Sequence, residues 1–189
     1  LYGMPAIASS LTSFDEEGME KAVEATVDVI EQALNVLPMV PENLRRPSVD
    51  ISAPHVSRWP NIESNPAWES DPEEALRNAF RHGELMLNLN TPPTWNGEYQ
   101  ITRLGMRWYR DAISFGSTTN DEKTATFTIG AASIDHTPVE KSDCDAVMEH
   151  KSSISCLPTW PQTHPLALDD RLLTWSLDSC EGKYPVWLQ

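Results

Sequence analysis

The chain has 189 residues, and its 28 acidic and 14 basic side chains give it a formal net charge of −14. That charge argues against nucleic acid as a direct partner, because a negative field repels phosphate backbones. The length suits a single domain over residues 1–189, and a hydrophobic content of 40% is high enough for a folded core. No run of residues approaches the roughly 20 apolar positions of a membrane span, so we expect no membrane partner.

A long helix is predicted over residues 14–36. Ser13 followed by Glu16 has the spacing of a capping box, in which a hydroxyl and a carboxylate satisfy amides of the first turn. Pro38 then stops the helix. Apolar residues recur inside it at helical spacing, and we expect them to form its buried stripe: Val23, Val27, Ile30 and Leu34.

Residues 38–71 are predicted to be an extended arm without regular structure. Seven prolines lie between residues 38 and 72, a density that forbids a long helix or an uninterrupted central strand. The arm has too many bulky apolar side chains for a solvated linker, so we expect it to lie against a surface of this chain or of a neighbour. These side chains are Val49, Ile51, Val56, Trp59, Ile62 and Trp68.

A second, short helix is predicted over residues 72–82. Asp71 can cap it, Pro72 suits its first position, and Glu74 follows three residues after the cap. Gly83 supplies the left-handed residue that ends many helices.

The remaining residues, 84–189, are predicted to be rich in β-structure. Leu85, Leu87 and Leu89 alternate with more polar residues, which is the period of a half-buried strand. Alternation predicts further strands at residues 99–103, 124–129, 173–177 and 184–188. A helical turn is expected from Ser142, and residues 168–173 could equally start a helix.

Strands without long helices between them favour antiparallel pairing. The expected fold class is therefore α+β: an antiparallel β-rich domain with one long N-terminal amphipathic helix, a second short helix and a long Pro-rich irregular arm.

The titratable residues form no recognisable catalytic or metal-binding motif. The five histidines lack HxH, HExxH and HxxxH spacing, and GxSxG and DxDxDG sequences do not occur. We therefore expect no metal, no cofactor and no catalysis. Asp135–His136 and Glu149–His150 place an acid beside an imidazole, but sequence neighbours on a strand point apart, so both are interpreted as surface pairs.

Three cysteines are an odd number and show no CxxC spacing: Cys144, Cys156 and Cys180. Idle thiols in a reducing compartment are the simplest interpretation, and at most one disulfide could form. Cys156 lies near His150 and His164 in the sequence, but nothing local activates its thiol.

Five of the seven tryptophans lie within two residues of a proline: Trp59, Trp68, Trp95, Trp160 and Trp187. Tryptophan and proline lose little entropy on ordering and suit flat contacts with proteins or sugars. With Val49, Ile51, Val56 and Ile62 of the arm, these residues are the interface candidates. The alternative is that the tryptophans fill a core.

A chain poor in motifs, with a rigid arm, points to a structural or interaction protein, without catalysis, that is a subunit or surface component of a large multi-chain assembly such as a virus capsid. Its partners would be protein subunits of the same or another type, and its location the virion or the cytoplasm. Because the chain begins at Leu1 rather than Met, we expect a processed product or a piece of a longer chain.

Two other classes stay open from the sequence. One is a carbohydrate- or peptide-binding module that uses exposed Trp and Tyr. The other is an enzyme whose site is assembled from distant residues, with His136 or His150 beside an acid.

Overall fold

The computed structural model shows a mixed α+β fold. It describes residues 4–13, 16–39, 67–110, 113–116, 127–129, 133–164 and 167–189. Most of the predicted arm, residues 40–66, lies outside the described residues, and so do its candidates Val49, Ile51, Val56, Trp59 and Ile62.

Four α-helices and two short 3₁₀ helices occur within the described residues. The helices are α1 (Met19–Val36), η2 (Ala67–Ser70), α2 (Pro72–Arg81), α3 (Asp143–Met148), α4 (Asp170–Asp178) and η3 (Val186–Leu188). The strands are β1 (Ala6–Leu11), β2 (Leu85–Thr91), β3 (Tyr99–Thr102), β4 (Met106–Arg110), β5 (Ile113–Phe115), β6 (Phe127–Ile129), β7 (Ser133–Thr137), β8 (Ser152–Pro158), β9 (Cys180–Glu181) and β10 (Tyr184–Pro185).

The central sheet has the order β1-β2-β8-β3 and is mixed, not antiparallel as the sequence predicted. β2 and β8 are antiparallel, whereas β1 runs parallel to β2 and β3 runs parallel to β8. Parallel neighbours need a connection of about a dozen residues or more. Residues 12–84, with α1 and α2, and residues 103–151, with α3, provide connections of that kind.

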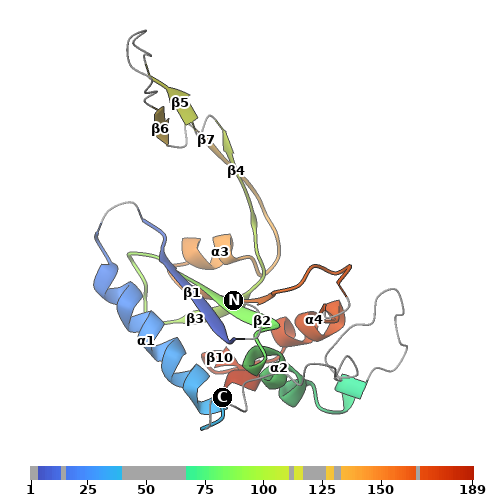
Figure 1. Cartoon of the computed structure of the whole chain (residues 1–189). Helices are drawn as coiled ribbons and strands as arrows, with labels where there is room; N and C mark the ends of the chain where they lie inside the picture. Colours follow the sequence, from blue (N-terminus) through green and yellow to red (C-terminus); the bar gives the residue numbers. More distant parts are fainter. Residues whose placement is uncertain are drawn as a thin grey trace, which may run out of the picture.

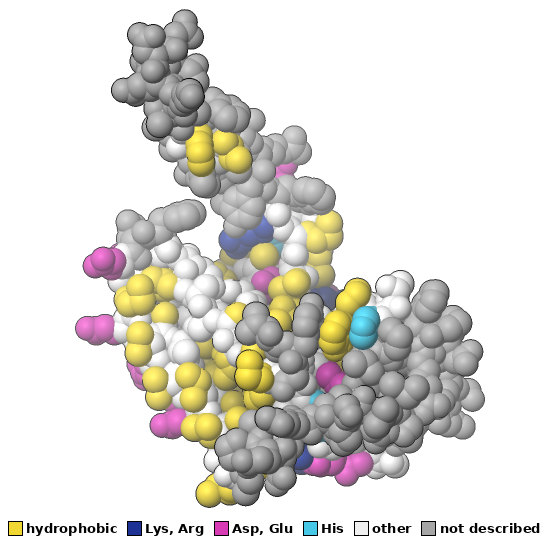
Figure 2. Space-filling view, viewed as in Figure 1, with side chains coloured by type: hydrophobic (Ala, Val, Ile, Leu, Met, Phe, Trp, Pro, Cys, Tyr) yellow, Lys and Arg dark blue, Asp and Glu magenta, His cyan; other side chains and the backbone are white. Residues whose placement is uncertain are grey.

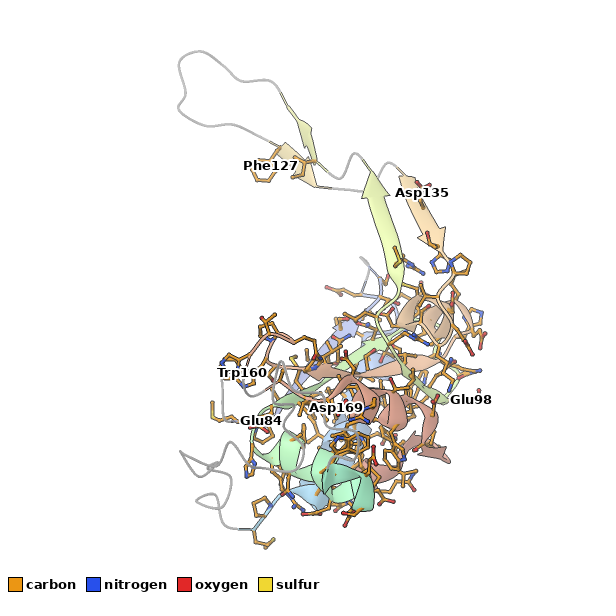
Figure 3. All side chains as sticks on the ribbon, turned by 90° about the vertical axis from the view of Figure 1, so that its right-hand side faces the viewer. Glu84, Glu98, Phe127, Asp135, Trp160 and Asp169 are labelled. Atoms are coloured by element: carbon orange, nitrogen blue, oxygen red, sulfur yellow. The ribbon has the colours of Figure 1, made fainter. Side chains whose placement is uncertain are left out.

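A two-stranded ribbon projects from the body of the molecule (Figures 1 and 3). β4 pairs with β7, and further out β5 pairs with β6, each pair antiparallel. The exposed side chains of Ile113 and Phe127 lie on this outer part. Residues 127–129 of the predicted strand 124–129 form β6, and the other residues of that strand lie outside the described residues.

The predicted first helix exists, but it begins at Met19 instead of residue 14. Gly18 precedes it in a left-handed conformation with φ of 85°, and no side chain caps the helix, so the predicted capping box is wrong. A Cβ atom at Gly18 would collide with Pro93, which explains why glycine stands at this entry.

The buried face of α1 is also different from the predicted one. The buried residues are Ala22, Ala25, Val29, Ala33 and Val36, whereas the predicted stripe of Val23, Val27, Ile30 and Leu34 is exposed. Small side chains let the helix lie close to the sheet.

Hydrogen bonds on both flanks of this buried face fix the rotation of α1 about its own axis. Ser9 and Thr26 share a bond of 2.7 Å on one flank, and on the other the Tyr99 hydroxyl donates to Asp28 at 3.1 Å. Burial and the Asp28 carboxylate raise the pKa of Tyr99, so its hydroxyl remains a donor at neutral pH.

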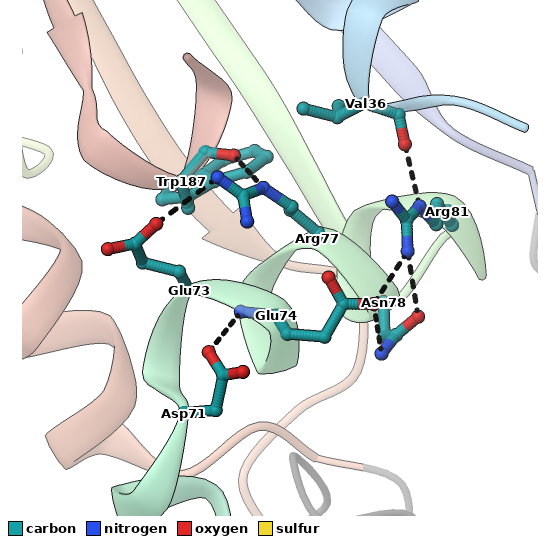
Figure 4. A network of polar contacts seen from close by, with 8 residues as sticks. All are labelled: Val36, Asp71, Glu73, Glu74, Arg77, Asn78, Arg81 and Trp187. Atoms are coloured by element: carbon teal, nitrogen blue, oxygen red, sulfur yellow. Dashed lines mark hydrogen bonds and ion pairs between the residues drawn. The ribbon is translucent and has the colours of Figure 1, made fainter.

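The second helix agrees closely with the prediction. The Asp71 side chain accepts from the Glu74 amide at 3.1 Å, and Pro72 occupies the first turn. Two arginines of α2 then bind neighbouring segments (Figure 4). Arg81 donates to the Val36 carbonyl at the end of α1 at 2.6 Å, and Arg77 donates to the Trp187 carbonyl at 2.9 Å.

The core lies between the sheet and the helices α1, α2, α4 and η3. The alternation predicted for Leu85, Leu87 and Leu89 is confirmed, because all three side chains are fully buried. Phe80 and Trp187 pack beside them with ring centroids 5.7 Å apart.

Two later predictions are corrected by the structure. Residues 173–177 belong to α4 and not to a strand, because the Asp169 side chain caps a helix by accepting from the Arg171 amide at 2.9 Å. Residues 184–188 form the short strand β10 followed by η3. The helical turn expected from Ser142 is confirmed as α3.

Gly83 and Gly97 form a matched test of the packing near the N-terminus. Both have positive φ, but an added Cβ would collide with the Met4 backbone at Gly83 and would meet open space at Gly97. Gly97→Ala should cost about 1–2 kcal/mol through its backbone alone. Gly83→Ala should cost roughly a further 1–3 kcal/mol through overpacking. Urea unfolding measures both variants, and equal losses would contradict this packing.

Candidate functional site

Three of the predicted interface tryptophans lie in the core of the chain itself. Trp68, Trp95 and Trp187 are buried, and each indole N–H has a partner within the chain. Trp68 donates to Asp169 at 3.1 Å, Trp95 to the Glu98 carbonyl at 2.7 Å, and Trp187 to the Ser176 hydroxyl at 3.0 Å. These side chains have almost no surface left to offer a partner.

Among the predicted interface tryptophans that the structure describes, Trp160 is the one that stays partly exposed (Figure 3). Its ring stacks on His164, with centroids 3.9 Å apart and planes 8° from parallel. One face of the indole is therefore occupied by the chain's own imidazole, which limits the flat surface available for a sugar.

The different positions of Trp187 and Trp160 predict different losses of stability. Trp187→Ala should lower the free energy of unfolding by about 3–5 kcal/mol, because it leaves a cavity and removes the indole N–H that donates to the Ser176 hydroxyl. Trp160→Ala should cost less than about 1.5 kcal/mol, since it loses a half-exposed ring stack. Urea unfolding followed by circular dichroism compares them, and a mild effect at Trp187 would contradict its core position.

A hollow of about 550 Å³ with a mixed polar and apolar lining lies between the end of β1, the start of β4 and α3. The Ser10 hydroxyl donates to Asn90 at 2.6 Å, and the Asn90 amide donates to Asp143 at 3.3 Å. Asp143 also accepts from the amides of Gly105 and Cys144, at 2.7 and 2.8 Å. This network holds the base of the ribbon against α3.

His136 is paired with an acid, but not with its sequence neighbour. Its Nε2 lies 2.8 Å from Asp145, which α3 places opposite β7. Hydrogen bonds from Ser142 and His136 lower the pKa of Asp145. His136 and Asp145 resemble the base and orienting acid of a hydrolase, but that chemistry also needs an activated nucleophile.

The second predicted acid–imidazole pair is separated. Glu149 bonds to Lys151 at 2.9 Å, and the His150 Nδ1 lies 2.5 Å from the Thr94 hydroxyl. Within the described residues no three histidine, cysteine or acidic side chains gather as metal ligands would.

The three cysteines are free thiols that the structure does not activate. Burial raises the pKa of Cys156 to about 11. Burial together with the Asp143 carboxylate raises the pKa of Cys144, and burial also raises the pKa of Cys180. Because the thiolate is the nucleophile, these thiols are poor nucleophiles at neutral pH.

Alkylation should reveal these thiols as unreactive. At pH 7 iodoacetamide should modify each cysteine of the folded chain more slowly than free cysteine, and the rate should rise as the pH increases toward the raised pKa values. For Cys156 a pKa of about 11 in place of 9 means roughly a hundredfold less thiolate. Mass spectrometry of the labelled peptides measures this. A cysteine faster than the free amino acid would support the enzyme alternative.

The outward face of α1 is apolar. Five side chains there are between 40% and 61% exposed, and we call them the α1 stripe: Met19, Val23, Val27, Ile30 and Leu34. Figure 2 shows hydrophobic side chains gathered over α1, with acidic ones along the outer margin. From Val23 onward the spacing of four, three and four residues is that of a helix seam that packs on a partner.

One signal in the sequence could have identified this surface. α1 carries two apolar stripes, one of alanines and valines and one of larger residues, and a helix on the surface of a domain buries only one. Helical spacing alone assigns the larger residues to the core, whereas the structure buries the smaller ones.

Comparison with known protein families and with characterised proteins finds no match to this chain. In the part of the chain that the structure describes, no helix combines the length and apolar character needed to cross a membrane.

Proposed function

We propose that this chain is a structural or interaction protein, a component of a multi-chain assembly such as a virus capsid, and that the α1 stripe contacts another protein chain. The observation that carries the proposal is the exposure of five large apolar side chains on one face of one helix. Contiguous apolar surface of this kind marks interaction sites in soluble proteins.

The energy of the α1 stripe shows how much contact is needed. Fully burying a large apolar side chain contributes about 1.5–3 kcal/mol, so covering the exposed half of five such side chains contributes roughly 4–7 kcal/mol. Association itself costs an estimated 4–15 kcal/mol. The α1 stripe alone therefore supports a weak complex at most, and a stable one needs further surface from the same chain.

The projecting ribbon is one source of that further surface. An isolated two-stranded ribbon is marginally stable in water and usually needs packing against another element. β5 and β6 extend away from the body and carry Ile113 and Phe127 exposed (Figures 1 and 3). A neighbouring subunit that covers these side chains would stabilise the ribbon and enlarge the interface.

The two alternatives have weaker support. The hydrolase-like pair of His136 and Asp145 lacks an activated thiol beside it. A sugar-binding face needs exposed aromatic rings, and Trp68, Trp95 and Trp187 are buried.

The size of the native particle tests the proposal. In its source the wild-type chain should sediment well above 21.2 kDa. Val27→Ser/Ile30→Ser should shift the distribution toward the monomer while the chain stays folded, with a loss of about 1.5–3 kcal/mol in the free energy of unfolding, because 47% and 40% of the two side chains are exposed and the rest is buried.

The matched control is Gln32→Ser/Asn35→Ser, which lies on the polar side of the same helix and should leave the particle unchanged. A wild-type chain that remains a folded 21.2 kDa monomer in its source and at high concentration would contradict the proposal.

A further inference from the structure

β1 is an edge strand of the central sheet among the described residues, with one side open. The Thr12 amide donates to the Thr91 carbonyl of β2 at 2.9 Å. Backbone groups of alternate residues point to the same side of a strand. The N–H and C=O groups of Ile7, Ser9 and Leu11 therefore point toward the open edge, where they can pair with another strand.

A shallow groove of about 250 Å³ runs between this open edge and α1. Leu11 lines it from β1, and Met19, Val23 and Val27 line it from the helix. The 2.7 Å bond between Ser9 and Thr26 fixes the distance between strand and helix. The groove thus combines an open backbone edge with three of the five side chains of the α1 stripe.

Acidic side chains border the far side of the α1 stripe. At 100° per residue, Glu20, Glu24 and Glu31 lie immediately beyond it on the helix, and all three are exposed. Two copies of this chain would each carry a charge of −14, and in an antiparallel pair of α1 helices the same glutamates would also lie on one side of the contact, so like charges repel. Charge therefore favours a different partner with basic side chains.

We propose that the groove binds an extended segment of another protein that adds to β1 as a further strand, with apolar side chains at its centre and Lys or Arg at its ends. The proposal rests on the proposed function, since it names the partner of the same surface. Strand addition obtains affinity from backbone hydrogen bonds and specificity from alternate side chains.

The dimensions fit such a segment. Side chains two apart on a strand point to the same face, about 6.6 Å from one another, and Val23 and Val27 are about 6 Å apart along α1. Glu20 and Glu31 are about 16 Å apart along the helix, within reach of basic side chains six residues apart on a strand, which span roughly 20 Å.

The probe is a fluorescent octapeptide of sequence Lys-Thr-Val-Thr-Val-Thr-Lys-Thr, with the whole chain titrated by anisotropy at about 0.15 M salt. We expect saturable binding, at least tenfold tighter than for the peptide with Glu in place of both Lys. Two further peptides carry methyl groups on the backbone nitrogens of either the odd-numbered or the even-numbered residues. Binding should be lost for the peptide whose methylated nitrogens face β1 and kept for the other peptide.

Charge reversal separates a specific site from general attraction to an acidic protein. Glu20→Lys/Glu31→Lys should invert the preference, so that the Glu peptide binds more tightly. The control Glu140→Lys/Glu149→Lys changes the net charge equally on exposed residues away from the groove and should alter binding less than twofold. Val23→Ser/Val27→Ser should weaken binding of the Lys peptide at least fivefold.

Three results would overturn the inference. They are no binding of the Lys peptide, equal binding of the two methylated peptides, or an affinity for the Lys peptide that Glu140→Lys/Glu149→Lys lowers as much as Val23→Ser/Val27→Ser does. Self-association of the wild type that Val23→Ser/Val27→Ser abolishes would identify a second copy as the occupant and also overturn it. If the peptide fails while Val27→Ser/Ile30→Ser still shrinks the native particle, the inference falls and the proposed function stands.

Discussion

The rotation of α1 on the central sheet decides which apolar side chains form the core and which face water. Thr26 bonds to Ser9 on one flank of the buried face, and Asp28 accepts from Tyr99 on the other. Turning the helix to bury the larger side chains would break both bonds and replace three alanines by residues too bulky for the same close approach. The exposed α1 stripe therefore follows from the way the core is built.

Hydrogen bonds from α2 also hold the end of α1 and the C-terminal segment in place. Arg81 satisfies a carbonyl at the end of α1, where unpaired carbonyls need donors, and Arg77 holds the backbone of Trp187. The indole of Trp187 then fills the space beside Phe80. Trp68, Trp95 and Trp187, which suggested an interface, are used inside the fold, so the proposed contact surface consists of aliphatic side chains on a helix and of a projecting ribbon.

Features set by neighbouring residues could be predicted from the sequence. Asp71 and Pro72 determine the start of α2 locally, and the alternation at Leu85, Leu87 and Leu89 has a single meaning because the strand is buried on one face. The buried face of α1 and the parallel pairs of the sheet depend on contacts across the chain, which periodicity does not report. Helical spacing alone therefore assigns Val23, Val27, Ile30 and Leu34 of the α1 stripe to the core, and the structure exposes them.

The net charge and the open edge have opposite effects on association. An unpaired edge strand invites pairing between copies, and natural proteins suppress this with charge or cover. Here a charge of −14 and the glutamates beside the α1 stripe oppose the approach of a second copy at long range. The same field attracts a basic segment and repels phosphate backbones. A single charge distribution can therefore leave an edge open and apolar while restricting the partners that reach it to proteins of complementary charge.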